Sequence, residues 1–133
     1  MVRESFFLSK LDAKIFINKL SIAQEERIEE RDGYQRFCDA FKMEDSKKDF
    51  PIILRALWEM IDNSDKDKIL KLDLFYYDGL EKKEYKPKDE VDLLKAVISG
   101  QKEVVDIASA MMRTVFNSQP AESENAKKKA VGE

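Results

Sequence analysis

Carboxylates are the only abundant side chains in this sequence that could take part in chemistry. The 133 residues include 27 acidic side chains, no histidine, one cysteine and four glycines. Histidine is the commonest general base and zinc ligand, and phosphate-binding loops need several glycines at fixed spacing. Acidic residues on charged helices are usually solvated. The composition therefore predicts that the protein is not an enzyme.

The single thiol, Cys38, is placed for packing. Tyr34, Phe37, Cys38 and Phe41 recur at i, i+3, i+4 and i+7, which puts them on one side of a helix. A cysteine on an apolar face is more often a small buried hydrophobic residue than a nucleophile. A lone cysteine cannot form an internal disulfide, and the N-terminal residues do not resemble a secretory signal. We therefore expect a cytoplasmic location.

The charge pattern argues against two classes of partner. The chain has 24 basic and 27 acidic residues and a net charge of −3, so no broad positive field attracts phosphates. Nucleic-acid binding is therefore unlikely on this composition. The longest apolar-rich segment, 51–61, is interrupted by Arg55 and Glu59, and a bilayer span needs about 20 apolar residues. No membrane partner is expected.

The sequence pattern predicts helices along the whole of the ordered part of the chain. Ser9 with Asp12, and then Ser21 with Gln24, have the spacing of helix-capping boxes. Whether residues 9–32 form one helix or two remains open at this level. We predict an all-α fold: a single compact domain of about five to six helices over 1–117, followed by a disordered tail over 118–133.

The middle and the end of the chain repeat this pattern. Apolar residues at helical spacing predict a helix that begins near Phe50-Pro51 and has Trp58 at the centre of the core. A further helix is expected over residues 69–77, ending at Asp78-Gly79, and a charged linker over 81–88. The last two helices are predicted from near Asp89 and from residue 104 to residue 116.

Residues of about 53–77 resemble a degenerate EF-hand, the calcium-binding helix–loop–helix of calmodulin and the light chains. Asp62 opens a stretch of twelve residues that Asp73 closes, and Ile69 stands at its apolar eighth place. The apolar positions of the incoming helix are held by Leu54, Leu57, Trp58 and Ile61. The resemblance implies that residues 62–73 form a loop between two helices.

The resemblance also implies a set of metal ligands. Asp62, Ser64 and Asp73 would coordinate through their side chains, and Lys68 through its backbone carbonyl. Calcium needs six to eight oxygen ligands, and here Lys66 replaces a ligand and Asp67 replaces the turn glycine. No cofactor is expected on this count, and calcium is the one ion that the resemblance offers as a candidate ligand. The alternative is a plain polar connection, because Asp and Asn favour turns and helix caps by themselves.

Two functions follow for a protein of this kind. The resemblance implies a non-catalytic adaptor that grips an amphipathic helix of a partner protein without a calcium trigger. Trp58, Met60, Met111 and Met112 are the candidate contacts, since flexible thioethers adapt to different partners. The alternative is a helical accessory or inhibitory protein, viral or bacterial, whose acidic residues bind a basic surface of a partner.

Overall fold

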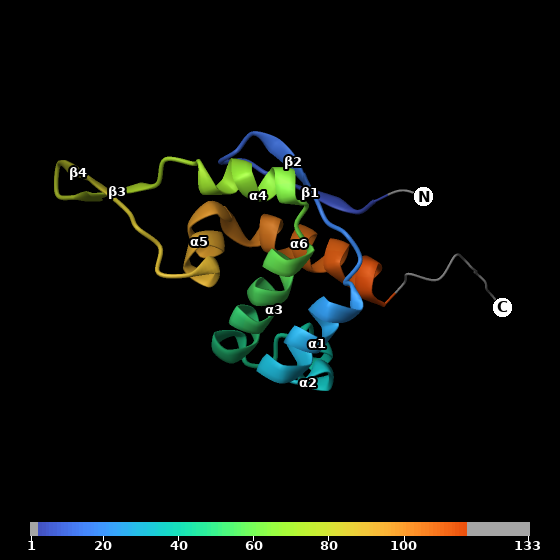
Figure 1. Ribbon diagram of the computed structural model, residues 1–133. Coiled ribbons are helices and arrows are strands. Elements are labelled where there is room, and N and C mark those ends of the chain that lie inside the picture. Colours follow the sequence, from blue (N-terminus) through green and yellow to red (C-terminus); the bar gives the residue numbers. More distant parts are fainter. Residues whose placement is uncertain (1–2, 117–133) are drawn as a thin grey trace.

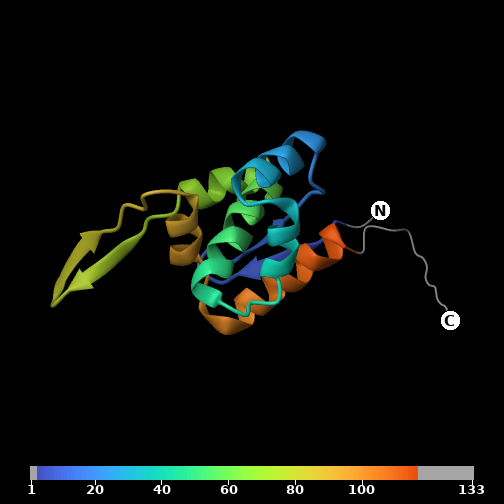
Figure 2. The same cartoon turned by 90° about the horizontal axis from the view of Figure 1, so that it is seen from below.

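A computed structural model describes residues 3–116, which form six helices and two separate β-hairpins (Figure 1). The first hairpin lies against the helices, whereas the second extends away from them in both views (Figures 1 and 2). In chain order the elements are β1 (Ser5–Leu8), β2 (Ala13–Phe16), α1 (Ile22–Arg31), α2 (Tyr34–Ala40), α3 (Ser46–Met60), α4 (Asn63–Leu70), β3 (Phe75–Asp78), β4 (Glu81–Glu84), α5 (Glu90–Val97) and α6 (Gly100–Val115).

The prediction of an all-α fold is therefore wrong, although the helices dominate and their number falls in the expected range. Two antiparallel two-stranded sheets, β1–β2 and β3–β4, occur where helices or a linker were expected. In the first, Phe6 pairs with Ile15, and Leu8 with Ala13. Phe6, Leu8, Ile15 and Ile17 are all buried, so the apolar residues alternate with a period of two, as in a strand with one covered face.

The residues Ser9–Asp12, read from the sequence as a helix start, form the turn of this first hairpin. Asp12 N–H donates to the Ser9 carbonyl at 3.1 Å, and Asp12 has a φ of 48°. Aspartate tolerates this left-handed conformation better than most residues. Residues 9–32, for which one helix or two were considered, thus form a turn, a strand and a single helix, α1. Ser21 caps that helix with the expected reciprocal bonds to Gln24.

One apolar core joins the first hairpin to the helices. Ile17 forms an isolated bridge with Ile61 at the end of α3, so the hairpin meets the α3–α4 connection directly. The largest fully buried side chains come from the first hairpin, from the residue that follows it and from all six helices: Leu8, Ile15, Ile17, Ile28, Phe37, Leu54, Leu57, Met60, Ile69, Leu94, Val97 and Met111. Trp58 packs only partly against this core, so its predicted central position is wrong.

Three buried acidic side chains bind main-chain N–H groups at the junctions between elements. Asp65 of α4 accepts from Phe16 N–H at 2.8 Å, and Asp49 of α3 accepts from Asp45 N–H at 3.0 Å. Glu103 of α6 accepts from Ser9 N–H at 3.0 Å and from Ser99 N–H at 2.7 Å. A buried carboxylate is tolerated only when donors of this kind replace its water. These three residues therefore hold the connections in place.

Both of the last helices form as predicted, but α6 begins ahead of the expected residue 104. Asp89 caps α5 by accepting from Asp92 N–H at 2.9 Å, and α6 begins at Gly100, whose φ is 78°. No helix among residues 3–116 is long and apolar enough to cross a membrane. The tail predicted over 118–133 lies outside the described residues.

Candidate functional site

The hairpin β3–β4 is built around a two-residue turn. Gly79 has a φ of 67°, and the flanking residues Asp78 and Glu81 pair with each other. Glycine at the first central position is typical of a type II′ turn, whose twist matches that of the strands it joins. The side chain of Leu80 stands beside Gly79 with a relative exposure of 102%. The hairpin therefore presents an apolar residue at its tip.

Aromatic side chains cover both faces of this hairpin. Phe75 and Tyr77 make an edge-to-face contact on one face, with ring centroids 5.7 Å apart, and the Lys82 ammonium lies 4.2 Å from the Phe75 centroid. Tyr76 lies on the other face, where Lys83 pairs with Asp78 at 3.1 Å. All three aromatic residues are about half exposed. Exposed aromatic residues grouped in this way are characteristic of binding surfaces.

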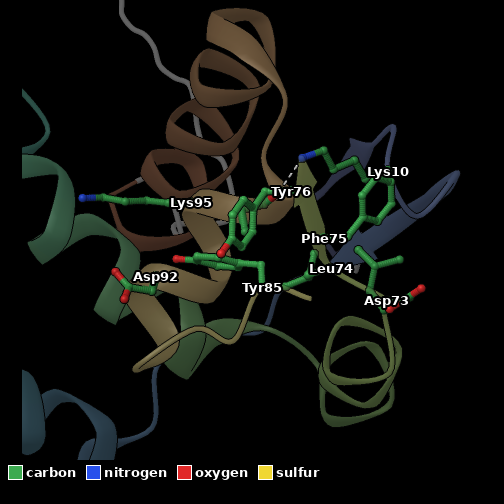
Figure 3. Close-up of a pocket in the computed structure, with 10 residues that line it drawn as sticks. Lys10, Asp73, Leu74, Phe75, Tyr76, Tyr85, Asp92 and Lys95 are labelled. Carbon is green, nitrogen blue, oxygen red and sulfur yellow. Dashed lines mark hydrogen bonds between the residues drawn. The ribbon is translucent and has the colours of Figure 1, made fainter. Parts of the chain in front are cut away.

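A hollow of about 640 Å³ lies where the hairpin joins the helices (Figure 3). Its walls come from the segment before and into β3, from the residue after β4, from α5 and from the turn of the first hairpin. The lining residues are Lys10, Leu72, Asp73, Leu74, Phe75, Tyr76, Tyr85, Asp92, Lys95 and Ala96. The volume falls within the range of sites that accept a small ligand or a few side chains.

Figure 3 shows Tyr76 and Tyr85 together at the centre of this hollow, between Lys10 and the two α5 residues Asp92 and Lys95. The Lys10 ammonium donates to the Ala96 carbonyl at 2.6 Å, which ties the first hairpin to α5. Asp92 accepts from Lys88 N–H at 3.3 Å. The floor is mainly apolar and the rim carries charges of both signs. An apolar side chain with polar neighbours suits such a site.

The four predicted metal ligands are not brought together. Residues 63–70 form helix α4, so the loop expected over 62–73 is absent and the helix–loop–helix layout does not form. Lys68 pairs with Asp65 at 3.4 Å, and Asp73 lines the hollow. Within residues 3–116 no cluster of three or more acidic, thiol or imidazole groups could hold a metal ion.

Asp62 is occupied by its own neighbours. Its carboxylate accepts from the Ser64 hydroxyl at 2.7 Å, from the Asn18 amide at 3.3 Å and from Arg3 at 3.1 Å. The hydrogen bonds from Ser64 and then Asn18 lower the pKa of Asp62 below its usual value. The residue that would open a calcium loop thus lies between α3 and α4, with its carboxylate bound to Ser64, Asn18 and Arg3.

The four predicted partner contacts do not share a surface. Met60 and Met111 lie in the core with relative exposures of 1% and 0%. Trp58 is half-buried, and the Lys66 ammonium lies 5.4 Å from its ring centroid. Met112 is exposed on α6. The two buried methionines fill the core, as methionines at helical spacing commonly do.

Sequence reasoning missed the residues of the hollow, Tyr76 and Tyr85 among them. A signal was present: Gly79-Leu80 stands between aromatic residues and the charged run 81–84, and a two-residue loop that begins with glycine between strand-like segments indicates a hairpin. Because these residues were interpreted as the end of a helix followed by a linker, the two strands were not predicted. The approach of Lys10 to α5 has no local sequence signal, since 86 positions separate Lys10 from Ala96.

The remaining reactive group, Cys38, lies partly covered against the core. Burial raises the pKa of its thiol, and the nearby Asp39 charge acts in the same direction. The thiolate that a nucleophile requires is therefore disfavoured. This agrees with a packing role for Cys38 beside Phe37 and Phe41.

Comparisons with known proteins do not add to this geometry. No protein-family model matches the sequence, and searches of curated proteins and of solved structures found no match. The function is therefore argued from the surface itself.

Proposed function

We propose that the chain is a non-catalytic protein-binding adaptor whose binding surface is the hairpin β3–β4 with the hollow at its base. One observation carries the proposal: aromatic residues are exposed on a hairpin that extends away from the body and borders a mainly apolar hollow. Water-exposed aromatic residues gain free energy when a partner covers them.

The chemistry of this surface suits a protein segment. Tyrosine combines a rigid apolar ring with a hydroxyl, and it is among the residues most enriched where proteins bind each other. Tyr76 and Tyr85 offer two such rings, and the ammonium and carboxylate groups of Lys95 and Asp92 can pair with polar groups beside an inserted side chain. The proposed ligand is a partner segment with one large apolar residue flanked by polar residues.

The adaptor role is proposed without calcium. Asp62 accepts hydrogen bonds from three neighbours, and residues 63–70 are helical. A trigger of the EF-hand type needs a loop whose oxygen atoms are free for the ion. The surface around the hairpin requires no such change, because its aromatic residues are already exposed.

The test is selection of binding peptides from a displayed library against the full chain. Selected peptides are expected to bind the wild type and to lose at least about tenfold in affinity against Tyr76→Ala. Val105→Ala is the matched control, because Val105 is an exposed apolar residue on α6, outside the hollow. Peptides that bind both variants equally, or the absence of any specific peptide, would contradict the proposal.

A second candidate follows from a different surface. A shallow hollow of about 350 Å³ on α1 is lined by Ile22, Glu25, Glu26, Glu29 and Tyr34. Three carboxylates beside two apolar side chains favour the accessory role, in which the protein covers a basic surface of a partner. Binding of a lysine-rich peptide that weakens steeply with salt, and is lost in the Glu25→Gln, Glu26→Gln double variant, would support this role over the first.

A further inference from the structure

The register of β3–β4 determines which main-chain groups point away from the hairpin. Asp78 and Glu81 flank the two-residue turn and so exchange hydrogen bonds with each other. Hydrogen-bonded pairs alternate with non-bonded ones along an antiparallel ladder, and the bond from Tyr85 N–H to the Leu74 carbonyl at 2.9 Å fits this alternation. Phe75 and Tyr77 alternate with these pairs. Their N–H and C=O groups therefore point outward along the β3 edge, and no other strand of residues 3–116 covers that edge.

We propose that this edge pairs antiparallel with β3 of a second copy of the chain, and that Leu80 of each copy enters the hollow of the other. The inference rests on the proposed function, because it names a ligand for the same surface. Free strand edges are ready templates for another chain, and an isolated two-stranded hairpin is only marginally stable. Pairing would convert two such hairpins into one four-stranded sheet.

The two edges of the hairpin differ in the charges that self-pairing would bring together. The outward residues of β4 are Lys82 and Glu84, by the same alternation. Every symmetric antiparallel register that matches outward groups on β4 places Lys82, Lys83 or Glu84 directly opposite itself. Like charges in directly opposed positions destabilise a sheet. Self-pairing of the β4 edge therefore always opposes one pair of like charges, although the register centred on Lys83 also places Lys82 opposite Glu84.

The β3 edge has no such conflict. The symmetric register centred on Tyr76 places Phe75 opposite Tyr77 of the second copy, and both residues direct their hydrogen-bonding groups toward each other. Aromatic pairs across strands are among the stabilising ones. Asp78, the one charged residue of β3, then faces Leu74. The pairing thus joins aromatic residues and brings no two like charges together.

The same register also gives the exposed Leu80 at the hairpin tip a place to bind. β3 begins at the body and ends at the turn (Figure 2). Antiparallel pairing with a second copy would therefore put the two bodies at opposite ends of the sheet. The turn of the second copy then lies beside residues 72–74, and Leu80 comes level with Leu72. Leu72 and Leu74 both line the hollow. A leucine that is fully exposed in one chain thereby meets an apolar hollow of suitable size in the other.

Sedimentation equilibrium of the full chain tests the inference. The interface is small, so association should be weak, and the average mass should rise toward that of a dimer between about 10 µM and about 1 mM. Tyr77→Pro removes an outward N–H from β3, and Lys82→Pro removes the matched one from β4; proline is tolerated at such edge positions. Tyr77→Pro should remain monomeric, whereas Lys82→Pro keeps the β3 edge, loses only the ammonium beside Phe75, and should still associate, within about fivefold of the wild type.

A second pair of variants tests the tip without touching the strands. Leu80→Asp changes a side chain that is fully exposed in the single chain, so the fold is retained. It should weaken association at least about tenfold. Leu70→Asp makes the same chemical change at an exposed position of α4 that does not line the hollow, and should have no effect.

The outcomes separate this inference from the proposed function. A wild type that stays monomeric throughout, an equal loss in Tyr77→Pro and Lys82→Pro, or unchanged association in Leu80→Asp would each overturn self-pairing. If the wild type is monomeric but binds selected peptides through Tyr76, the ligand is not a second copy of the chain, and the proposed adaptor function is retained. Self-association with the expected variant pattern but no specific peptide supports self-pairing and removes the adaptor.

Discussion

The carboxylate of Asp65 accepts a hydrogen bond from the main-chain N–H of Phe16 at 2.8 Å, which fastens helix α4 to strand β2. The two residues are 49 positions apart, and Asp65 is buried. Ile17 and Ile61 pair just beside this bond. A segment that resembles a metal-binding loop is thereby held as a helix against the first hairpin.

Replacing Asp65 by alanine should lower the free energy of unfolding by about 1–3 kcal/mol, because Phe16 N–H would lose its acceptor while remaining partly buried. Chemical denaturation measured by far-UV circular dichroism gives this value. The control is Asp67→Ala, an exposed aspartate on the same helix, which should change stability by less than about 0.5 kcal/mol. Equal effects of the two substitutions would show that the bond to Phe16 contributes nothing.

Glu103 should make the fold sensitive to acid. Burial acts to raise the pKa of Glu103, but hydrogen bonds from Ser99 and Ser9 N–H outweigh it and hold the pKa below its usual value. A lowered folded pKa contributes stability that is complete above the unfolded value of about 4.3 and is lost as pH falls through the folded value. Thermal melts of Glu103→Gln should therefore show a lower midpoint at pH 7 and a shallower decline below pH of about 5 than the wild type. Parallel curves would contradict this account.

Truncation of two neighbouring residues of α4 should change the stability of the protein to very different extents. Ile69 has a relative exposure of 0%, so Ile69→Ala should cost about 2–5 kcal/mol through lost burial and a new cavity. Leu70 is 61% exposed, so Leu70→Ala should change stability by less than about 0.5 kcal/mol. Urea denaturation of both variants checks the orientation of α4. Equal losses of stability in the two variants would contradict this orientation.

Calcium should leave the protein unchanged. Asp62 is engaged by Ser64, Asn18 and Arg3, and Asp73 lies at the hollow instead of beside Asp62. Titration with calcium to about 1 mM, followed by Trp58 emission, should show no saturable change. Trp58 precedes Asp62 by four residues and would report a rearrangement there. A saturable response at micromolar calcium would restore the EF-hand interpretation.

Cys38 should react slowly with disulfide reagents. Burial, aided by the Asp39 charge, raises the pKa of its thiol, so less thiolate is present near neutral pH than in a free cysteine. The reaction with a chromogenic aromatic disulfide at pH 8 should be at least about fivefold slower than that of free cysteine. Unfolding in urea should abolish the difference. A rate faster than that of free cysteine would instead indicate an activated thiol.

Several local features were predicted correctly because they depend on residues close together in the chain. The capping box of Ser21 and Gln24 and the start of a helix at Asp89 are both confirmed. In each, a side-chain oxygen satisfies a main-chain N–H three residues later, and this needs no distant partner. The helical face of Phe37 follows in the same way from a period of 3.6 residues.

The strands were misread because short apolar runs fit more than one structure. Ser9 and Asp12 have the spacing of a capping box but also that of a tight turn, and only the pairing of Phe6 with Ile15 distinguishes the two. Residues 69–77 contain both the end of α4 and the start of β3. Only the last residues of α4 and the first of β3 fall within this stretch, too few of each to show its period, so the sequence alone did not divide it.

By itself, the sequence determined the predominance of helices and several of their ends, because these follow from composition, caps and periodicity within a few residues. The tertiary structure alone decided that Asp65 binds Phe16, that Met60 and Met111 enter the core, and that Lys10 closes a hollow with Tyr85 and α5. Contacts of this kind join distant residues. They form only when the whole core packs, since the entropy of closing long loops is offset collectively by burial and not by any one local pattern.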